Sequence, residues 1–196
     1  MDYKLKRAPG VYLAGFMGSG KTTVARVLAD RLGWDFIDLD AEIEAAELAT
    51  IAHLFETRGE PEFRRIETEA LRKVMRRIER GMPSVIALGG GSFVQPVNTE
   101  LLEGHGISIW LDCPFETIEA RINGARINSA RINGTRIDDD ARTPEADSRP
   151  LARDRERFRQ LYEERRAAYG LATYRIDADC EVERAVDLIL ELPCWK

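Results

Sequence analysis

The stretch "GFMGSGKT" at residues 15–22 decides how the rest of the chain is interpreted. It matches the pattern G-x-x-x-x-G-K-[ST], follows the apolar run 11–16, and opens residues 22–32, whose apolar side chains recur at helical spacing. Glycines let backbone N–H groups approach phosphate oxygens, and a helix N-terminus adds partial positive charge. The sequence therefore predicts a strand, a loop and a helix that together bind a nucleoside triphosphate. The alternative is a glycine-rich turn with an exposed lysine.

The residue types in this loop indicate how ATP and a metal ion would be held. Lys21 supplies a mobile cation for the β- and γ-phosphates, and Thr22 offers a hydroxyl to Mg²⁺. The backbone amides and small side chains around them complete the site. The residues predicted to bind ATP in this stretch are Gly18, Ser19, Gly20, Lys21, Thr22 and Thr23.

Strand-like and helix-like segments alternate along the chain. Strands are expected at 11–16, 34–40, 84–91, 106–112 and 173–178. Helices are expected at 22–32, 61–79, from Pro114 onward, at 153–169 and at 182–192. This alternation predicts an α/β fold of three layers, α/β/α, with a central five-stranded parallel sheet, and the pattern at 15–22 makes it a P-loop fold. Ligands of such folds bind at the carboxyl ends of the strands.

Length and composition point to an ordinary soluble globular protein. The 196 residues, 44% apolar and 32% charged, fit a single domain spanning 1–196. A net charge of −5 argues against nucleic acid as a partner. Three cysteines without a CxxC pair favour a reducing compartment, and the apolar run 11–16 is too short for a membrane span. We therefore expect a cytoplasmic protein that does not bind a membrane.

Two acidic side chains, Asp38 and Asp40, end the predicted strand 34–40. Side chains two residues apart share one face of a strand, unless the strand has already ended. Beside a Mg-nucleotide, one carboxylate could hold the metal through water while the other orients and deprotonates an attacking hydroxyl. The alternative for Asp40 is an N-cap of the helix that "AEIEAAE" would form.

Three further features could contribute to an acceptor site. Arg64 and Glu67 are i,i+3 neighbours beside the apolar stripe of the long predicted helix, a spacing that also suits a surface ion pair. The glycines of "LGGG" (88–91) let a ligand approach the backbone, or form only a flexible turn. Arg165 lies near the end of the late predicted helix, where it could equally be a solvated arginine.

Taken in order, these segments resemble the shikimate kinase family, in the nucleoside monophosphate kinase-like group of P-loop proteins. The resemblance rests on "GFMGSGKTT", "DFIDLD", "GEPEFRRIE", "LGGG", "SRPL" and "RRAAY". It extends from about Val11 to the last predicted helix. It implies ATP-dependent phosphorylation of the 3-hydroxyl of shikimate, a step of aromatic amino acid biosynthesis.

For the nucleotide, the resemblance implies that Lys21 and Thr22 serve ATP and Mg²⁺ and that Asp38 assists the metal. Arg149, in "SRPL", would be the lid arginine that reaches the phosphates on closure and takes part in catalysis with Lys21. Arg121, placed by its distance from the preceding strand, would pack against the adenine.

For the acceptor, the resemblance implies that Asp40 binds the attacking hydroxyl and acts as the base. Arg64 and Arg165 would hold the substrate carboxylate, which arginine can do in bidentate form. The backbone expected to contact the ring is that of Gly89, Gly90 and Gly91, chiefly Gly90. The proline that usually stands inside "RRAAY" is missing, which leaves Arg166 as an alternative to Arg165.

The segment "ARINGARINSARINGTRIDDD" (120–140) repeats Arg-Ile every five residues and expands the lid to about 120–150. That period forms a continuous stripe on neither a helix nor a strand. The Asn-Gly pairs at 123–124 and 133–134 favour turns. We predict a flexible or partly helical insertion. The alternatives to Arg121 at the adenine are Arg126, Arg131 and Arg136.

Repeat expansion without a selected function is the preferred interpretation of this segment. The alternative is that its extra arginines attract ATP or a partner. For the whole chain, the rival functions are another small-molecule kinase, such as one acting on gluconate, and a non-catalytic ATP-binding module. The resemblance also implies a monomer.

Overall fold

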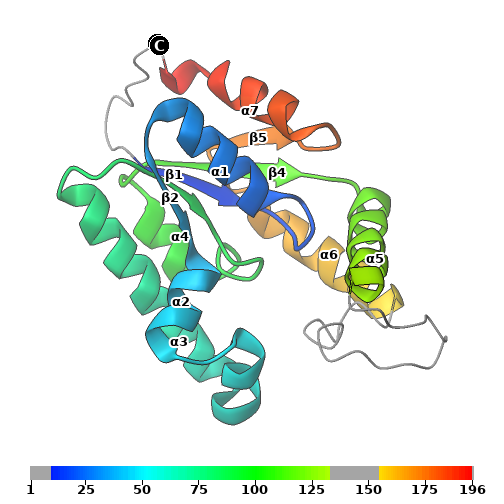
Figure 1. Cartoon of the computed structure of the whole chain (residues 1–196). Coiled ribbons are helices and arrows are strands. Elements are labelled where there is room, and N and C mark those ends of the chain that lie inside the picture. Colours follow the sequence, from blue (N-terminus) through cyan, green and yellow to red (C-terminus); the bar gives the residue numbers. More distant parts are fainter. Residues whose placement is uncertain (1–9, 133–154, 196) are drawn as a thin grey trace.

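Five parallel strands form a single sheet, as the sequence predicts (Figure 1). The computed structural model describes residues 10–132 and 155–195, with the backbone alone at 125–132. The strands are β1 (Gly10–Ala14), β2 (Asp35–Asp38), β3 (Ser84–Ala87), β4 (Ile107–Asp112) and β5 (Tyr174–Asp177). Their order is β2-β3-β1-β4-β5, and every neighbouring pair is parallel. The central strands β1 and β3 are buried along their whole length, because both faces of the sheet are covered.

Helices cover both faces of this sheet, which confirms the three-layer α/β/α prediction (Figure 1). The described helices are α1 (Lys21–Leu32), α2 (Leu39–Glu47), α3 (Ile51–Glu79), α4 (Pro96–Leu102), α5 (Phe115–Ile132), α6 (Arg155–Tyr169) and α7 (Val182–Leu190), followed by a 3-10 turn at Pro193–Trp195. Helices α1 and α7 lie side by side, joined by the Arg31–Asp187 ion pair. None of the described helices is long and apolar enough to cross a membrane.

The predicted strand at 34–40 is too long. β2 ends at Asp38, and Asp40 lies in the first turn of α2. The N-cap is Asp38 rather than Asp40, because its Oδ1 accepts hydrogen bonds from Asp40 N at 3.1 Å and Ala41 N at 3.3 Å. The two carboxylates therefore do not share a strand face, and each has a separate position at the carboxyl edge of the sheet.

The predicted helix at 61–79 is also incomplete. α3 begins at Ile51, where Thr50 Oγ1 accepts from His53 N at 3.2 Å, and it continues to Glu79. Gly59 interrupts it with φ 75° and ψ 169°, just before Pro61. Glycine tolerates this positive φ, and the ring of Pro61 clashes with the backbone of the preceding helical turn, so two helical segments meet at a kink here.

The prediction of a turn at Asn123–Gly124 is wrong, because α5 continues through both residues to Ile132. Ile118 and Ile122 are buried against the rest of the protein, and this packing overrides the turn preference of Asn-Gly. The repeat is therefore helical in its first part. The second pair, at 133–134, lies outside the described residues.

Candidate active site

The phosphate-binding loop joins β1 to α1. Gly18 and Gly20 adopt φ of 81° and 92°, a region that residues with a Cβ rarely enter. Gly20 is also the N-cap of α1, so the backbone amides of the first helical turn face the loop. This is the curled backbone at a helix N-terminus that binds phosphate oxygens.

Two polar side chains of the loop are buried in it. Lys21 Nζ donates to the carbonyls of Gly15 at 2.8 Å and Phe16 at 2.9 Å, so the lysine is folded back onto the loop. Ser19 Oγ is buried and has no hydrogen-bond partner within the described part of the chain. Thr23, also predicted to bind ATP, is exposed in the first turn of α1.

The loop also lies against helix α5. A Cβ added to Gly18 would come within 3.2 Å of Ile122 Cγ1 and 3.3 Å of Ile118 Cγ2. Both isoleucines are buried. The phosphate-binding loop thus lies against α5, the helix that contains the first part of the repeat.

The predicted metal residues, Thr22 and Asp38, are hydrogen-bonded to each other. Thr22 Oγ1 donates to Asp38 Oδ2 at 2.8 Å, while the other oxygen of Asp38 caps α2. Groups of three or more His, Cys, Asp or Glu side chains able to hold a metal are absent from the described residues. The arrangement suits Mg²⁺, which is commonly held by one or two protein oxygens, water and substrate phosphates.

Arg121 lies between the phosphate loop and the loop that follows β5. Its guanidinium donates to Ala178 O at 3.1 Å, to Cys180 O at 3.5 Å and to Ser19 O at 3.5 Å. These bonds fix the guanidinium between the two loops, and its predicted contact with the adenine stays a prediction.

Two carboxylates converge on the glycine loop after β3. A Cβ on Gly89 would lie 2.6 Å from Asp40 Oδ1 and 3.0 Å from Glu67 Oε1. Glu67 is only 1% exposed, and this burial raises the pKa of its carboxyl, opposed by Arg64 and reinforced by the nearby Asp40. The carboxylate of Asp40 is therefore in contact with the backbone that is predicted to meet the substrate.

Arg64 reaches the next part of the same loop. A Cβ on Gly91 would lie 2.6 Å from Arg64 Nη2, so the guanidinium touches the glycine backbone. Its Nη1 donates to Glu67 Oε2 at 2.8 Å, and the group also lies over the ring of Phe63 at 5.2 Å from the centroid. Glu67 and Phe63 thus fix the orientation of Arg64.

Arg165 reaches the glycine loop from α6. Its Nη1 donates to Gly90 O at 3.2 Å, and a Cβ on Gly90 would lie 3.5 Å from Met17 N in the phosphate loop. The structure therefore brings Arg64 and Arg165 to adjacent glycines, beside Asp40 and next to the phosphate loop. Of the remaining predicted residues, Arg149 lies outside the described residues.

A sequence model described as shikimate kinase matches residues 17–192. The chain belongs to the shikimate kinase family. This confirms the resemblance seen in the sequence and, with it, the prediction of an ATP-dependent kinase.

Individual shikimate kinases match most of the chain. That of Salinibacter ruber is 38% identical over 187 residues, covering 93% of this chain and 83% of the relative. Among solved structures, shikimate kinase from Acinetobacter baumannii in complex with shikimate is 33% identical with a TM-score of 0.72, and the match covers 93% of each chain. A gluconokinase from Sinorhizobium meliloti has a TM-score of 0.53 at 17% identity, over 93% of this chain and 90% of its own, and shares the fold alone.

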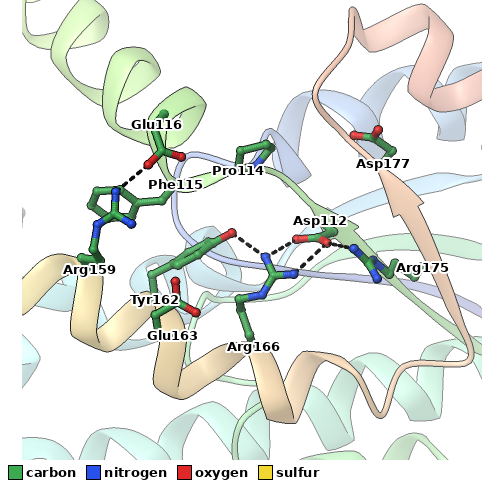
Figure 2. A pocket seen from close by; sticks show the side chains of 10 residues that line it. All are labelled: Asp112, Pro114, Phe115, Glu116, Arg159, Tyr162, Glu163, Arg166, Arg175 and Asp177. Atoms are coloured by element: carbon green, nitrogen blue, oxygen red, sulfur yellow. Dashed lines mark hydrogen bonds and ion pairs between the residues drawn. The ribbon is translucent and has the colours of Figure 1, made fainter.

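A pocket of about 640 Å³ lies between α5, α6 and the ends of β4 and β5, outside the predicted shikimate kinase site (Figure 2). Arg166 binds both oxygens of Asp112 in its wall, and Arg175 reaches the same carboxylate from β5. Arg159 is paired with Glu116. The lining consists of Asp112, Pro114, Phe115, Glu116, Arg159, Tyr162, Glu163, Arg166, Arg175 and Asp177.

Three structural features of the candidate site were not predicted from sequence. Glu67 was recognised as a partner of Arg64, but its burial and its approach to Gly89 were not. Phe55 packs on Phe63 with 4.4 Å between the ring centroids. It lies in the first part of α3, before residue 61, where no helix was predicted. Tyr169 donates to the glycine loop. The inward stripe of α6 includes Tyr169, but nothing in the sequence shows what its hydroxyl meets.

Proposed function

We propose that the chain transfers the γ-phosphate of ATP to the 3-hydroxyl of shikimate, with Asp40 as the base. The observation that carries this proposal is the meeting of three side chains on one loop. Asp40, Arg64 and Arg165 contact Gly89, Gly91 and Gly90 respectively, and that loop touches the phosphate-binding loop. This proximity supports a base and a carboxylate clamp beside the phosphate-binding loop.

The proposed binding of the acceptor, shikimate, follows from the charges of these residues. The guanidinium groups of Arg64 and Arg165 offer the parallel N–H donors that bind a carboxylate in bidentate form. With the acid group of shikimate held there, Asp40 is positioned to accept the proton of the attacking hydroxyl. Glu67 keeps Arg64 in place through their 2.8 Å ion pair.

The proposed binding of the nucleotide rests on the phosphate-binding loop and on Arg121 and Asp38 beside it. Backbone amides at the start of α1 suit phosphate oxygens, as does the Ser19 hydroxyl, which has no hydrogen-bond partner among the described residues. Lys21 would exchange its two carbonyl acceptors for the β- and γ-phosphates. Arg121 would lie along the adenine, and Thr22 with Asp38 would hold Mg²⁺, which neutralises phosphate charge when bound.

Other parts of the proposal concern the whole chain. Arg149 would reach the phosphates from the lid at about 120–150 and stabilise the charge of the transition state. We further propose that residues 1–196 act as one domain and as a monomer in the cytoplasm. Sedimentation of the purified full chain tests the monomer directly, because a dimer would double the observed mass.

The test of the function is a transfer assay across hydroxy acids. The full chain with ATP and Mg²⁺ is expected to produce shikimate 3-phosphate and to leave gluconate unchanged. Turnover of gluconate without turnover of shikimate would replace this proposal with the sugar-acid kinase. ATP binding without transfer to any acceptor would point to a non-catalytic module. Thermal shifts with shikimate, ATP-Mg²⁺ and both show binding independently of turnover.

A further inference from the structure

Tyr169, the last residue of α6, holds the central carbonyl of the glycine loop. Its hydroxyl donates to Gly90 O at 2.5 Å, and the side chain is only 1% exposed. Its ring packs near Trp110 of β4, with centroids 6.1 Å apart, so the hydroxyl is delivered from a fixed position. Burial raises the pKa of this hydroxyl to about 12, so it remains a donor at neutral pH.

Arg165 donates to the same carbonyl. It precedes Tyr169 by four residues, so both side chains project from the same face of α6. A carbonyl oxygen has two lone pairs, and these two donors occupy them together. If Arg165 turns its donors to a substrate carboxylate, Tyr169 is the one of these two side chains that still donates to Gly90 O.

The orientation of this carbonyl determines the direction of the next amide. In a trans peptide the C=O of one residue and the N–H of the next point in opposite directions. A Gly90 carbonyl bound toward α6 therefore directs the Gly91 N–H away from α6. Ser92 N donates to Gly89 O at 3.0 Å and closes a turn around this peptide. Glycine accepts either of the two orientations that the central peptide of such a turn can take, so the hydrogen bonds from α6 select one of them.

We propose that Tyr169 is a positioning residue for acceptor binding: its hydroxyl fixes the Gly90–Gly91 peptide in the orientation that receives the acceptor. The proposal rests on the proposed function, since the glycine loop must be the acceptor site. Tyr169 itself need not touch either substrate. It acts through the loop, so removing its hydroxyl should weaken the binding of shikimate and leave the binding of ATP unchanged.

The experiment compares Tyr169→Phe with Tyr162→Phe in the full-length enzyme. Tyr162 is a matched control because it is a buried tyrosine of the same helix whose hydroxyl donates to Cys113 O at 3.0 Å, away from the glycine loop. Each substitution removes a single oxygen and keeps the ring. The measurements are kcat, KM for shikimate, KM for ATP, and the thermal midpoint of both variants.

Tyr169→Phe is expected to raise KM for shikimate about five- to tenfold, the effect of losing one hydrogen bond, with KM for ATP changed less than about twofold. Tyr162→Phe is expected to leave the ratio of the two KM values as in the wild type. A Tyr169→Phe enzyme with a lower midpoint but an unchanged shikimate KM would reduce Tyr169 to a structural residue and overturn the proposal. So would an equal rise for both substrates. Failure of the wild type to phosphorylate shikimate would instead overturn the proposed function.

Discussion

Arg165 and Arg166 are neighbours in α6, yet their guanidinium groups bind different parts of the molecule. Arg165 donates to Gly90 O at 3.2 Å, whereas Arg166 binds both oxygens of Asp112 at 2.8 and 3.2 Å (Figure 2). Successive helical side chains point about 100° apart, and the glycine loop and Asp112 lie in those two directions. This relationship favours Arg165 over Arg166 as the residue that binds the substrate carboxylate.

Arg165→Ala is therefore expected to raise KM for shikimate by about 10- to 100-fold, because charge-assisted hydrogen bonds to the carboxylate are lost. KM for ATP should change little. The matched control is Arg166→Ala, which breaks the pair with Asp112 and is expected to lower the thermal midpoint by about 4 °C without affecting either KM. Equal kinetic effects of the two substitutions would contradict the assignment.

Asp40→Asn tests the base. Removing proton transfer to this carboxylate should lower kcat by about 10²- to 10⁴-fold, while the thermal shift produced by ATP-Mg²⁺ stays as in the wild type. Glu42→Gln is a suitable control, because Glu42 is an exposed acid in the same first turn of α2. A kcat retained in Asp40→Asn would show that another group accepts the proton.

Asp38→Asn separates metal binding from helix capping. Asparagine is also a good N-cap, so α2 and the thermal midpoint should be nearly unchanged. The missing charge beside Thr22 should instead increase the Mg²⁺ concentration needed for half-maximal activity, measured by titrating Mg²⁺ at saturating ATP. An unaltered Mg²⁺ titration would exclude Asp38 from the metal site.

Glu67 makes stability depend on pH with a definite sign. Its carboxyl has a raised pKa in the folded protein, so the folded state favours the protonated form. The resulting contribution to the free energy of unfolding is fully present below the pKa of the unfolded state and is lost as the pH rises through the pKa of the folded state. Glu67→Gln stays neutral, and Arg64 stays charged throughout. The thermal midpoint of Glu67→Gln minus that of the wild type should therefore increase as the pH rises above 4.5, the ordinary pKa of a glutamate. A constant difference would show that the pKa is not raised.

Arg121→Ala tests the adenine contact. It is expected to raise KM for ATP about tenfold by removing a cation that stacks on the base, with KM for shikimate nearly unchanged. The control is deletion of residues 125–139, which removes Arg126, Arg131 and Arg136 and should leave KM for ATP as in the wild type. If the deletion raises KM for ATP and Arg121→Ala does not, a repeat arginine meets the adenine instead.

Much of the fold was predictable because its signals are local. The phosphate loop has its own pattern, and the buried strands are short apolar runs between glycines and charged residues. The end of β2 was not predictable, since either Asp38 or Asp40 could cap the next helix and the choice depends on backbone geometry. Asn123–Gly124 was misjudged because packing by Ile118 and Ile122 outweighs the local turn preference.

The candidate site was predictable as a set of residues but not as an arrangement. The sequence indicates Arg64 and Arg165 individually, about a hundred positions apart, and only the folded sheet brings both to one glycine loop. The burial of Glu67 and the Tyr169 bond have no local signature, because each depends on a partner from another element. Long-range contacts of this kind are set by topology rather than by sequence periodicity.

The contact of Gly18 with Ile118 and Ile122 gives the five-residue repeat a geometric meaning. This contact fixes the near end of α5, while the far end of the helix lies within the repeat. Inserting or removing one repeat unit within the helix would turn the exit direction of the chain by about 140° and shift it about 7.5 Å along the axis. The number of units within the helix thus sets the direction in which the chain leaves α5, and chains with different numbers of units would leave it in discrete, widely separated directions.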